Sequence, residues 1–178
     1  MDTVQDNYYT SESDQRGPVD KYLTFALGDN KYGINILKAS CIQEFGKSTP
    51  LPQAPDYILG IINLRGDMVP LIDLRRRFGM KLIKHTSAND VIVVRIASGE
   101  AETTVGLVVD AVSEVNDVSE KECKPPPSFG NGLSTAYIKG VATVNESMLI
   151  LLDVDLLMDP GGMKVIDSIP SEEPQQTS

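Results

Sequence analysis

An internal repeat is the feature that most constrains the fold of this chain. The segment "YILGIINLRGDMVPLIDL", which begins at Tyr57, aligns without a gap with "YIKGVATVNESMLILLDV", which begins at Tyr137. Most aligned positions place one apolar residue over another, and six are identical: Tyr57/Tyr137, Ile58/Ile138, Gly60/Gly140, Met68/Met148, Leu71/Leu151 and Asp73/Asp153. The general likeness of apolar strands accounts poorly for six identities in one register. The repeat therefore predicts one β module used twice.

The rest of the central region also has the residue pattern of short strands. In "KYLTFAL" the residues Leu23, Phe25 and Leu27 lie on one face, and after the turn "GDNK" the segment "YGINIL" alternates again. Further strand candidates are "VIVVRIA", "TVGLVVDAV", "AYIKGVATV" and "SMLILLDV". A weaker likeness places Gly33 of "YGINIL" over Gly106 of "VGLVVD". We therefore expect an all-β fold with short helical turns.

The helical turns are expected directly after the repeated strands. Asp73 precedes "LRRRFG", where its carboxylate can cap a first turn that Gly79 can end. Asp153 holds the same place in the second repeat. Pro70 has no amide hydrogen to donate to a ladder, so its strand is expected at an edge or a bulge.

The two repeats differ most at one hairpin turn. The first has Arg65 and Gly66 at its centre, and the second has Asn145 and Glu146. An Arg-Gly-Asp adhesion signal would need an exported protein, and the polar, acidic first residues are not a signal peptide. A hairpin turn in which Gly66 supplies a positive φ angle explains the triplet better. Arg65 could then bind a partner, or pair internally and hold the hairpin to its neighbour.

The ends of the chain differ from its centre in composition. Residues 1–19 and 161–178 are polar and lack periodicity, so we expect them to be flexible tails. The 178 residues allow one domain or two small ones. Residues 20–160 are expected to form two β-barrel units with approximate limits 20–85 and 86–160, and strands could be exchanged between these units.

The charge and the cysteine content narrow the class of partner. The formal net charge of −9 argues against nucleic acid, because phosphate binding needs clustered Lys and Arg. It argues equally against an anionic membrane surface, and no apolar run is long enough to insert across a membrane. Cys41 and Cys123 form no metal or redox motif, which indicates reduced thiols in a cytosol. We expect a cytoplasmic protein whose partners are other proteins.

No motif for catalysis or for a cofactor is complete. The segment "FGKST" lacks the first glycine of a phosphate loop, because that position is Cys41, and prolines follow where the helix should begin. His85, the single histidine, lies in a polar stretch and is expected to be solvated. Arg75, Arg76 and Arg77 are expected to form a solvated helix face, with a partner contact as the alternative. The sequence thus predicts no enzyme activity, no bound cofactor and no metal site.

The chain resembles the CheW-like coupling proteins of bacterial chemotaxis. The resemblance rests on "YLTFALGDNKYGINILKASCI" at 22–42, "YILGIINLRGDMVPLIDLRRRFG" at 57–79, "VGLVVDAVSEV" at 105–115 and "YIKGVATVNESMLILLDVDLLM" at 137–158. It implies two SH3-like five-stranded β-barrels packed side by side, which agrees with the repeat. It also implies a non-catalytic adaptor of two-component signal transduction. Such a scaffold connects the cytoplasmic tips of methyl-accepting chemoreceptors to the regulatory domain of the chemotaxis histidine kinase, in arrays at the membrane.

The resemblance also implies which residues contact the partners. Arg65 matches the arginine of the family's characteristic turn, and Val112 and Val115 match apolar positions associated with a groove. Ala39 and Cys41 fall where relatives often have Val and Glu, so the acidic side chain is missing at position 41. The implied set of partner-binding residues is Arg65, Ala39, Cys41, Gly60, Val112 and Val115. The glycines expected at turns or at close backbone approaches are Gly33, Gly66, Gly106 and Gly140, together with Gly60.

Two other functions are compatible with the sequence. The first is a small regulatory β-barrel protein that binds a nucleotide or another signalling partner outside chemotaxis. Saturable, magnesium-dependent ATP binding would favour it. The second is an oligonucleotide-binding β-barrel, which the net charge of −9 disfavours.

Overall fold

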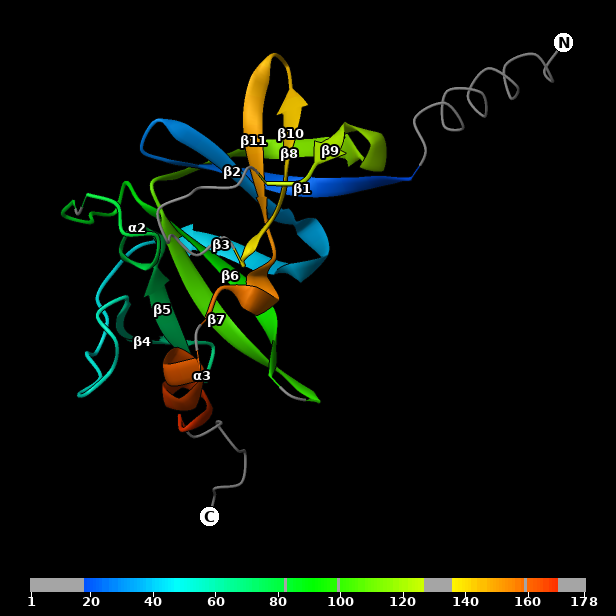
Figure 1. Cartoon of the computed structure of the whole chain (residues 1–178). Helices are drawn as coiled ribbons and strands as arrows, with labels where there is room; N and C mark the ends of the chain where they lie inside the picture. Colours follow the sequence, from blue (N-terminus) through cyan, green and yellow to red (C-terminus); the bar gives the residue numbers. More distant parts are fainter. Residues whose placement is uncertain (1–17, 82, 99, 127–135, 159, 170–178) are drawn as a thin grey trace, which may run out of the picture.

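The protein consists mainly of strands in two curled sheets that pack against each other (Figure 1). The structure is a computed structural model and describes residues 18–81, 83–98, 100–126, 136–158 and 160–169. Its strands are β1 (Val19–Leu27), β2 (Asn30–Asn35), β3 (Ala39–Glu44), β4 (Ile58–Leu64), β5 (Asp67–Asp73), β6 (Asp90–Ser98), β7 (Ala101–Val109), β8 (Ala111–Ser119), β9 (Cys123–Lys124), β10 (Ile138–Val144) and β11 (Ser147–Leu152). Its helices are η1 (Ile36–Lys38), α2 (Leu74–Arg77), η2 (Glu120–Glu122), η3 (Val154–Leu156) and α3 (Pro160–Asp167). The expected all-β fold of two packed barrel subdomains is confirmed.

Each sheet combines strands from both sequence repeats. Sheet A has the strand order β8-β1-β2-β11-β10-β9, and sheet B has the order β3-β6-β7-β5-β4. The chain leaves sheet A after β2, passes through η1 into β3, and returns from sheet B after β7 into β8. Sheet B is therefore built by residues 39–109, while the first two strands of the chain join the last four in sheet A.

The strand registers give the repeat a structural basis. Leu71 in β5 lies opposite Gly106 in β7, and Leu151 in β11 lies opposite Gly33 in β2, both in parallel ladders. A Cβ atom on Gly106 would lie 2.8 Å from Leu71, and one on Gly33 would lie 3.5 Å from Leu151. The two glycines thus have equivalent neighbours, which explains the likeness of the segments that contain them.

Three apolar clusters lie in the part of the chain that the structure describes. The main core lies between the sheets and joins Phe25 of sheet A to Ile92 of sheet B, both fully buried. Two smaller clusters include Leu151 of sheet A and Leu71 of sheet B. Because successive strand residues point to opposite faces, Ile72, the neighbour of Leu71, belongs to the main core. Each sheet therefore buries apolar side chains on both faces.

Gly60 and Gly140 lie at equivalent places where another chain segment approaches closely. The segment at Thr49 bridges to β4, and a Cβ atom on Gly60 would collide with the carbonyl group of Thr49. A Cβ atom on Gly140 would lie 2.5 Å from Sγ of Cys123 and 2.7 Å from the carbonyl oxygen of Lys124. Only a residue without a side chain leaves room for either approach.

Asp73 and Asp153 cap equivalent helical turns, and this prediction is confirmed. Asp73 Oδ1 accepts a hydrogen bond from the backbone N–H of Arg75 in α2, and Asp153 Oδ1 accepts one from Asp155 in η3. Gly79 follows α2 with a φ angle of +72°, which ends the helix as expected.

Pro70 departs from its expected place. It lies in β5, which is an interior strand of sheet B rather than an edge strand. The ladder between β5 and β7 begins at Leu71, so Pro70 has no donor role on that side.

The chain ends also differ from the expected tails. Strand β1 begins at Val19, and residues 1–17 and 170–178 lie outside the described residues. Pro160–Asp167 form the helix α3, whose Ile166 is 3 % exposed in the main core. Asp167 Oδ1 accepts a hydrogen bond from Ser98 Oγ at 2.8 Å. The expectation of a flexible tail is therefore wrong for this helix. Its glycines and polar residues did not indicate a helix, but the burial of Ile166 in the main core holds the segment in place.

Candidate functional site

Arg65 stands exposed at the tip of the β4–β5 hairpin. Arg65 and Gly66 have φ angles of +55° and +92°, the positive pair that a type I′ turn requires. Asn63 Oδ1 accepts a hydrogen bond from the backbone N–H of Gly66 at 3.0 Å, which stabilises the turn. Within the described residues the guanidinium group of Arg65 has no ion-pair or hydrogen-bond partner. Internal pairing of Arg65 is therefore not observed among these residues.

The edge strands β3 and β8 hold most of the other candidate residues, at equivalent positions. Strand β3 pairs with β6, strand β8 pairs with β1, and each ladder contains one register shift. The shift falls after Ala39 in β3 and after Val112 in β8, so these two residues correspond to each other. Three residues further along each strand, Ile42 corresponds to Val115. Ala39 and Val112 are half-buried against the main core, whereas Ile42 and Val115 are 46 % and 48 % exposed. The two sheets thus present equivalent apolar edges.

Ile42 is absent from the residues predicted from the sequence. A signal for it was available in the likeness of Gly33 to Gly106. The offset that relates these glycines also relates Ile42 to Val115. Extending that alignment into the following strand would have paired the two exposed residues.

Cys41 stands where the second repeat has Glu114. Cys41 is a free thiol, half-buried beside Phe45 in the small cluster of sheet B, while Glu114 is exposed. A thiol packed in this way does not replace an exposed carboxylate. Between these two equivalent positions, only β8 carries the acidic side chain.

The remaining candidates are placed unevenly. Gly60 is buried in β4, and as a glycine it has no side chain that could contact a partner. Cys41 in β3 and Leu64 in β4, the neighbour of Arg65, pack against the same small cluster. Sheet B therefore holds Ala39, Cys41 and Gly60 and carries Arg65 on a hairpin turn, whereas Val112 and Val115 belong to the edge of sheet A.

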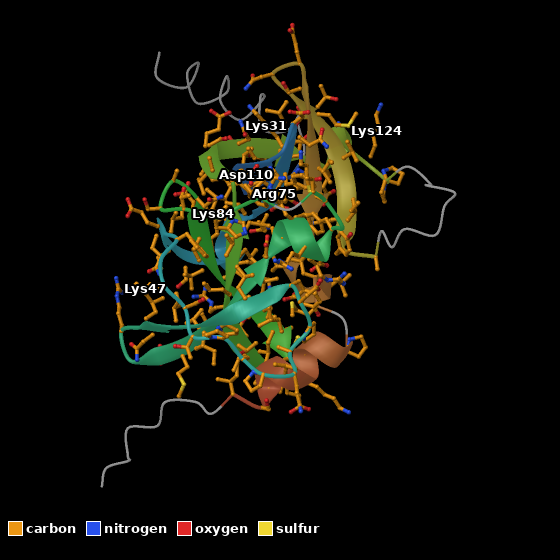
Figure 2. The ribbon with its side chains drawn as sticks, turned by 90° about the vertical axis from the view of Figure 1, so that its left-hand side faces the viewer. Lys31, Lys47, Arg75, Lys84, Asp110 and Lys124 are labelled. Atoms are coloured by element: carbon orange, nitrogen blue, oxygen red, sulfur yellow. The ribbon has the colours of Figure 1, made fainter. Side chains whose placement is uncertain are left out.

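The arginines of α2 do not form a solvated helix face, and that prediction is wrong. Figure 2 shows Arg75 and Asp110 next to each other. Arg75 donates from Nε and Nη2 to the two carboxylate oxygens of Asp110 at 2.9 and 2.6 Å, and the side chain of Arg75 is 11 % exposed. Hydrogen bonding by Arg75 holds the pKa of Asp110 below its usual value, and the backbone N–H of Gly28 donates to the same carboxylate at 2.8 Å. Arg76 Nε lies 3.5 Å from Asp73. These side chains bind other parts of the same chain.

Arg77 lies between the two repeats. Its guanidinium carbon is 5.4 Å from the ring centroid of Tyr57 and 5.3 Å from that of Tyr137. Its Nε donates to the carbonyl oxygen of Leu157 at 2.5 Å. Tyr57 and Tyr137 occupy the same position in the two aligned repeats. The guanidinium group of Arg77 therefore makes a cation–π contact with the equivalent ring of each repeat.

His85 is largely enclosed by the fold, so the expectation that it is solvated is wrong. Its side chain is 9 % exposed, and Nε2 lies 2.8 Å from Asp73 Oδ2. Its ring packs against Phe45 with the centroids 5.2 Å apart. Since Asp73 also caps α2, His85 ties the following loop to the start of that helix. The polar sequence around His85 did not reveal that the second oxygen of a buried aspartate needs a partner.

A hollow of about 270 Å³ lies between η1 and η3, but its carboxylates are engaged in structural contacts. Asp155 accepts hydrogen bonds from Lys38 Nζ and from the backbone N–H of Ala97, and Asp153 caps η3. Across the described ranges, no three His, Cys, Asp or Glu groups are placed to hold a metal ion. None of the helices in these ranges has the length and apolar character needed to cross a bilayer.

Known proteins resemble this chain over most of its length. Residues 21–160 match the CheW-like domain family. The chain is 36 % identical over 149 residues to the chemotaxis protein CheW of Klebsiella aerogenes, covering 84 % of this chain and 87 % of that protein. It is 35 % identical over 133 residues to the chemotaxis protein CheW of Rhizobium meliloti, with coverages of 75 % and 83 %. The crystal structure of the scaffolding protein TtCheW from Thermoanaerobacter tengcongensis superposes with a TM-score of 0.72 at 32 % identity, covering 82 % of this chain and 96 % of that chain.

Proposed function

The chain belongs to the CheW-like domain family, a family of non-catalytic chemotaxis adaptors, and we propose that it couples chemoreceptors to the chemotaxis histidine kinase. Its partners in this proposal are the cytoplasmic tips of the receptors and the regulatory domain of the kinase. Its place of action is the cytoplasmic side of receptor arrays. The alternative of a nucleotide-binding regulator outside chemotaxis is not favoured, because the relatives are chemotaxis proteins.

The observation that carries this proposal is the pair of equivalent apolar edges. Ile42 and Val115 are β-branched residues that usually pack against neighbours in a sheet, yet each is about half exposed. Ala39 and Val112 lie beside them, half-buried at the rim of the main core. A standard protein interface buries about 800 Å² on each partner. We infer that a partner covers each edge strand together with the adjoining rim of the core.

Arg65 has a different role in the proposal. An exposed ion pair contributes about 0–1 kcal/mol, so Arg65 cannot supply the affinity alone. Its planar guanidinium group can bind a carboxylate with two parallel hydrogen bonds, which fixes orientation. The apolar edges would supply most of the binding energy, and Arg65 would set the register against acidic or polar side chains of a receptor tip.

The first experiment replaces the exposed edge residues by glutamate. Val115→Glu and Ile42→Glu should each reduce co-purification with a receptor cytoplasmic fragment or with the kinase regulatory domain. The melting temperature should stay close to that of the unchanged protein, because both side chains are about half exposed. Leu156→Glu is the matched control, since Leu156 is 51 % exposed on η3. Normal binding of both partners by both edge variants would refute the proposed surface.

The second experiment reverses the charge of Arg65. Arg65→Glu should weaken partner association roughly tenfold, because a favourable ion pair becomes a repulsive one. Its melting temperature should not change, since the side chain is exposed. The control is Lys164→Glu on α3, another exposed cation. A drop of many degrees in the melting temperature of Arg65→Glu would show that Arg65 is a structural residue.

A further inference from the structure

Strand β8 begins beside an ion pair that joins it to the opposite sheet. Asp110 immediately precedes β8, where the chain crosses from sheet B to sheet A. Its carboxylate binds Arg75, which follows β5 of sheet B, and accepts a hydrogen bond from the backbone N–H of Gly28 after β1 of sheet A. Figure 2 shows Arg75 and Asp110 side by side in the middle of this face. We call this contact the Arg75–Asp110 clamp.

Strand β3 begins beside a second ion pair at the other crossing. Lys38 immediately precedes β3, and its Nζ donates to the two carboxylate oxygens of Asp155 at 3.1 and 3.0 Å. Asp155 also accepts a hydrogen bond at 2.7 Å from the backbone N–H of Ala97. The repeat-related glycines Gly33 and Gly106 pair with Thr24 and Val93 in their hairpins. Four residues after these partners stand Gly28 and Ala97, so the two backbone donors are equivalent. We call this contact the Lys38–Asp155 clamp.

The two clamps lie at corresponding chain crossings, with Lys38 and Asp110 one residue apart in the register of the repeat, and have opposite polarity. Arg75 and Asp155 each stand two residues after a capping aspartate, but Arg75 carries a positive charge and Asp155 a negative one. The partner at the chain crossing is correspondingly Asp110 in one clamp and Lys38 in the other. If β5 lay beside β2 of its own repeat instead of β7, Arg75 would lie at the crossing that carries Lys38, and two cations would come close. Opposite polarity therefore favours the strand-exchanged arrangement that the sheets have.

We propose that the two clamps are positioning elements for partner binding. The Arg75–Asp110 clamp fixes the start of β8 against sheet B and so sets the place of Val115. The Lys38–Asp155 clamp fixes the start of β3 against sheet A and so sets the place of Ile42. The inference rests on the proposed function only in that these two edges contact the partners.

The test removes one carboxylate charge at a time in the full chain. Asp110→Asn should speed amide hydrogen exchange at the start of β8 at least about tenfold while leaving β3 unchanged. Asp155→Asn should do the same at the start of β3 and leave β8 unchanged. Asp117→Asn is the matched control, because the Lys21–Asp117 ion pair joins β8 to β1 within one sheet and is largely exposed. The circular dichroism spectrum of each variant reports that it is folded.

Strand specificity separates positioning from general stability. A clamp that only stabilised the fold would change exchange in β3 and β8 alike, and that result would overturn the proposal. So would an unchanged rate at both strands, or an equal effect of Asp117→Asn. If Asp110→Asn does not fold, Arg75→Lys keeps the charge, removes the planar fork and should again affect β8 alone.

Partner affinity is measured separately on the same variants. Asp110→Asn and Asp155→Asn should each weaken association with the receptor fragment or the kinase domain severalfold, while Lys164→Glu on α3, which lies outside both edge strands, should bind normally. Normal affinity in both clamp variants, despite faster exchange, would refute the role in partner binding. If the unchanged protein binds neither partner, the proposed function fails, and the exchange result still decides whether the clamps hold the strands.

Discussion

Replacing Gly60 by alanine is expected to destabilise the fold, and this effect tests why glycine stands there. Gly60 has a φ angle of +155°, and an added Cβ atom would collide with the carbonyl group of Thr49. The backbone of Thr49 exchanges two hydrogen bonds with Ile61 at 2.9 and 2.8 Å. Because a backbone carbonyl cannot rotate away as a side chain would, the segment at Thr49 must separate from β4.

The size of the effect follows from three contributions. A side chain in a backbone conformation of this kind costs about 1–3 kcal/mol. Crowding of a closely packed site costs about 1–3 kcal/mol. Weakening the two bridging hydrogen bonds costs about 1 kcal/mol each. Since all three arise from one displacement and overlap, we expect Gly60→Ala to lower the free energy of unfolding by about 3–5 kcal/mol.

Two other glycines provide controls that separate these contributions. Gly66→Ala meets no atom within 4 Å but has a φ angle of +92°, so it reports the backbone cost alone. Gly140→Ala meets Cys123 and Lys124 closely without a positive φ angle, so it reports crowding alone. Urea unfolding followed by circular dichroism gives the free energy of each variant. Gly60→Ala should be the least stable of the three.

One result would refute this reasoning. If Gly60→Ala unfolds at the same urea concentration as the unchanged protein, the approach of Thr49 is not what requires glycine. If the stable variant also fails to bind its partners, Gly60 is a contact residue, as the family resemblance alone implies.

Asp110, Arg77 and His85 each stabilise the fold through a polar contact that a single substitution removes. Hydrogen bonding by Arg75 lowers the pKa of the Asp110 carboxyl group in the folded protein. The stability that this ion pair contributes is therefore complete above the pKa of an unfolded aspartate, about 3.9, and is lost as the pH falls through the lower pKa of the folded state. Thermal melts below about pH 4 should therefore show a smaller loss for Asp110→Asn than for the unchanged protein; parallel curves would contradict this. Arg77→Met should lower the free energy of unfolding by about 2–4 kcal/mol, because it loses two aromatic rings and a carbonyl partner, whereas a melting temperature equal to that of Lys164→Met would exclude this role. His85→Leu should cost about 1–3 kcal/mol in urea unfolding because it removes the partner of Asp73 Oδ2, and His85→Gln should recover part of that loss.

Local chemistry and repetition made part of the fold predictable. The caps at Asp73 and Asp153 depend on a carboxylate two residues before a backbone N–H, which the sequence displays directly. The exchange of strands could not be derived in the same way. Alternating apolar residues indicate that a strand has a buried face, but they do not say which strand lies beside it. That Gly33 faces Leu151 of the other repeat depends on packing between distant segments.

The errors about charged side chains have one physical cause. Arg75 binds an acid 35 residues away, and Arg77 binds a carbonyl group 80 residues away. A polar run has the same composition whether its side chains are solvated or are paired across a fold. The enclosure of the His85 side chain likewise depends on a contact that only the folded chain creates. The partner-binding role of Arg65 remains a prediction, since it concerns a second molecule.

Positions that the two repeats share are under a different constraint from those where they differ. Leu71 and Leu151 are identical because each must fill the space opposite a glycine in its own sheet, and packing acts on both copies alike. The hairpin tips are free of that constraint, because Arg65 and Asn145 are both exposed. A partner contact acts on one surface at a time and so permits the copies to diverge. If Arg65 marks such a contact, Arg65→Asn, which makes the tips alike, should weaken partner association without changing the melting temperature; a large loss of stability would show that packing constrains the tip after all.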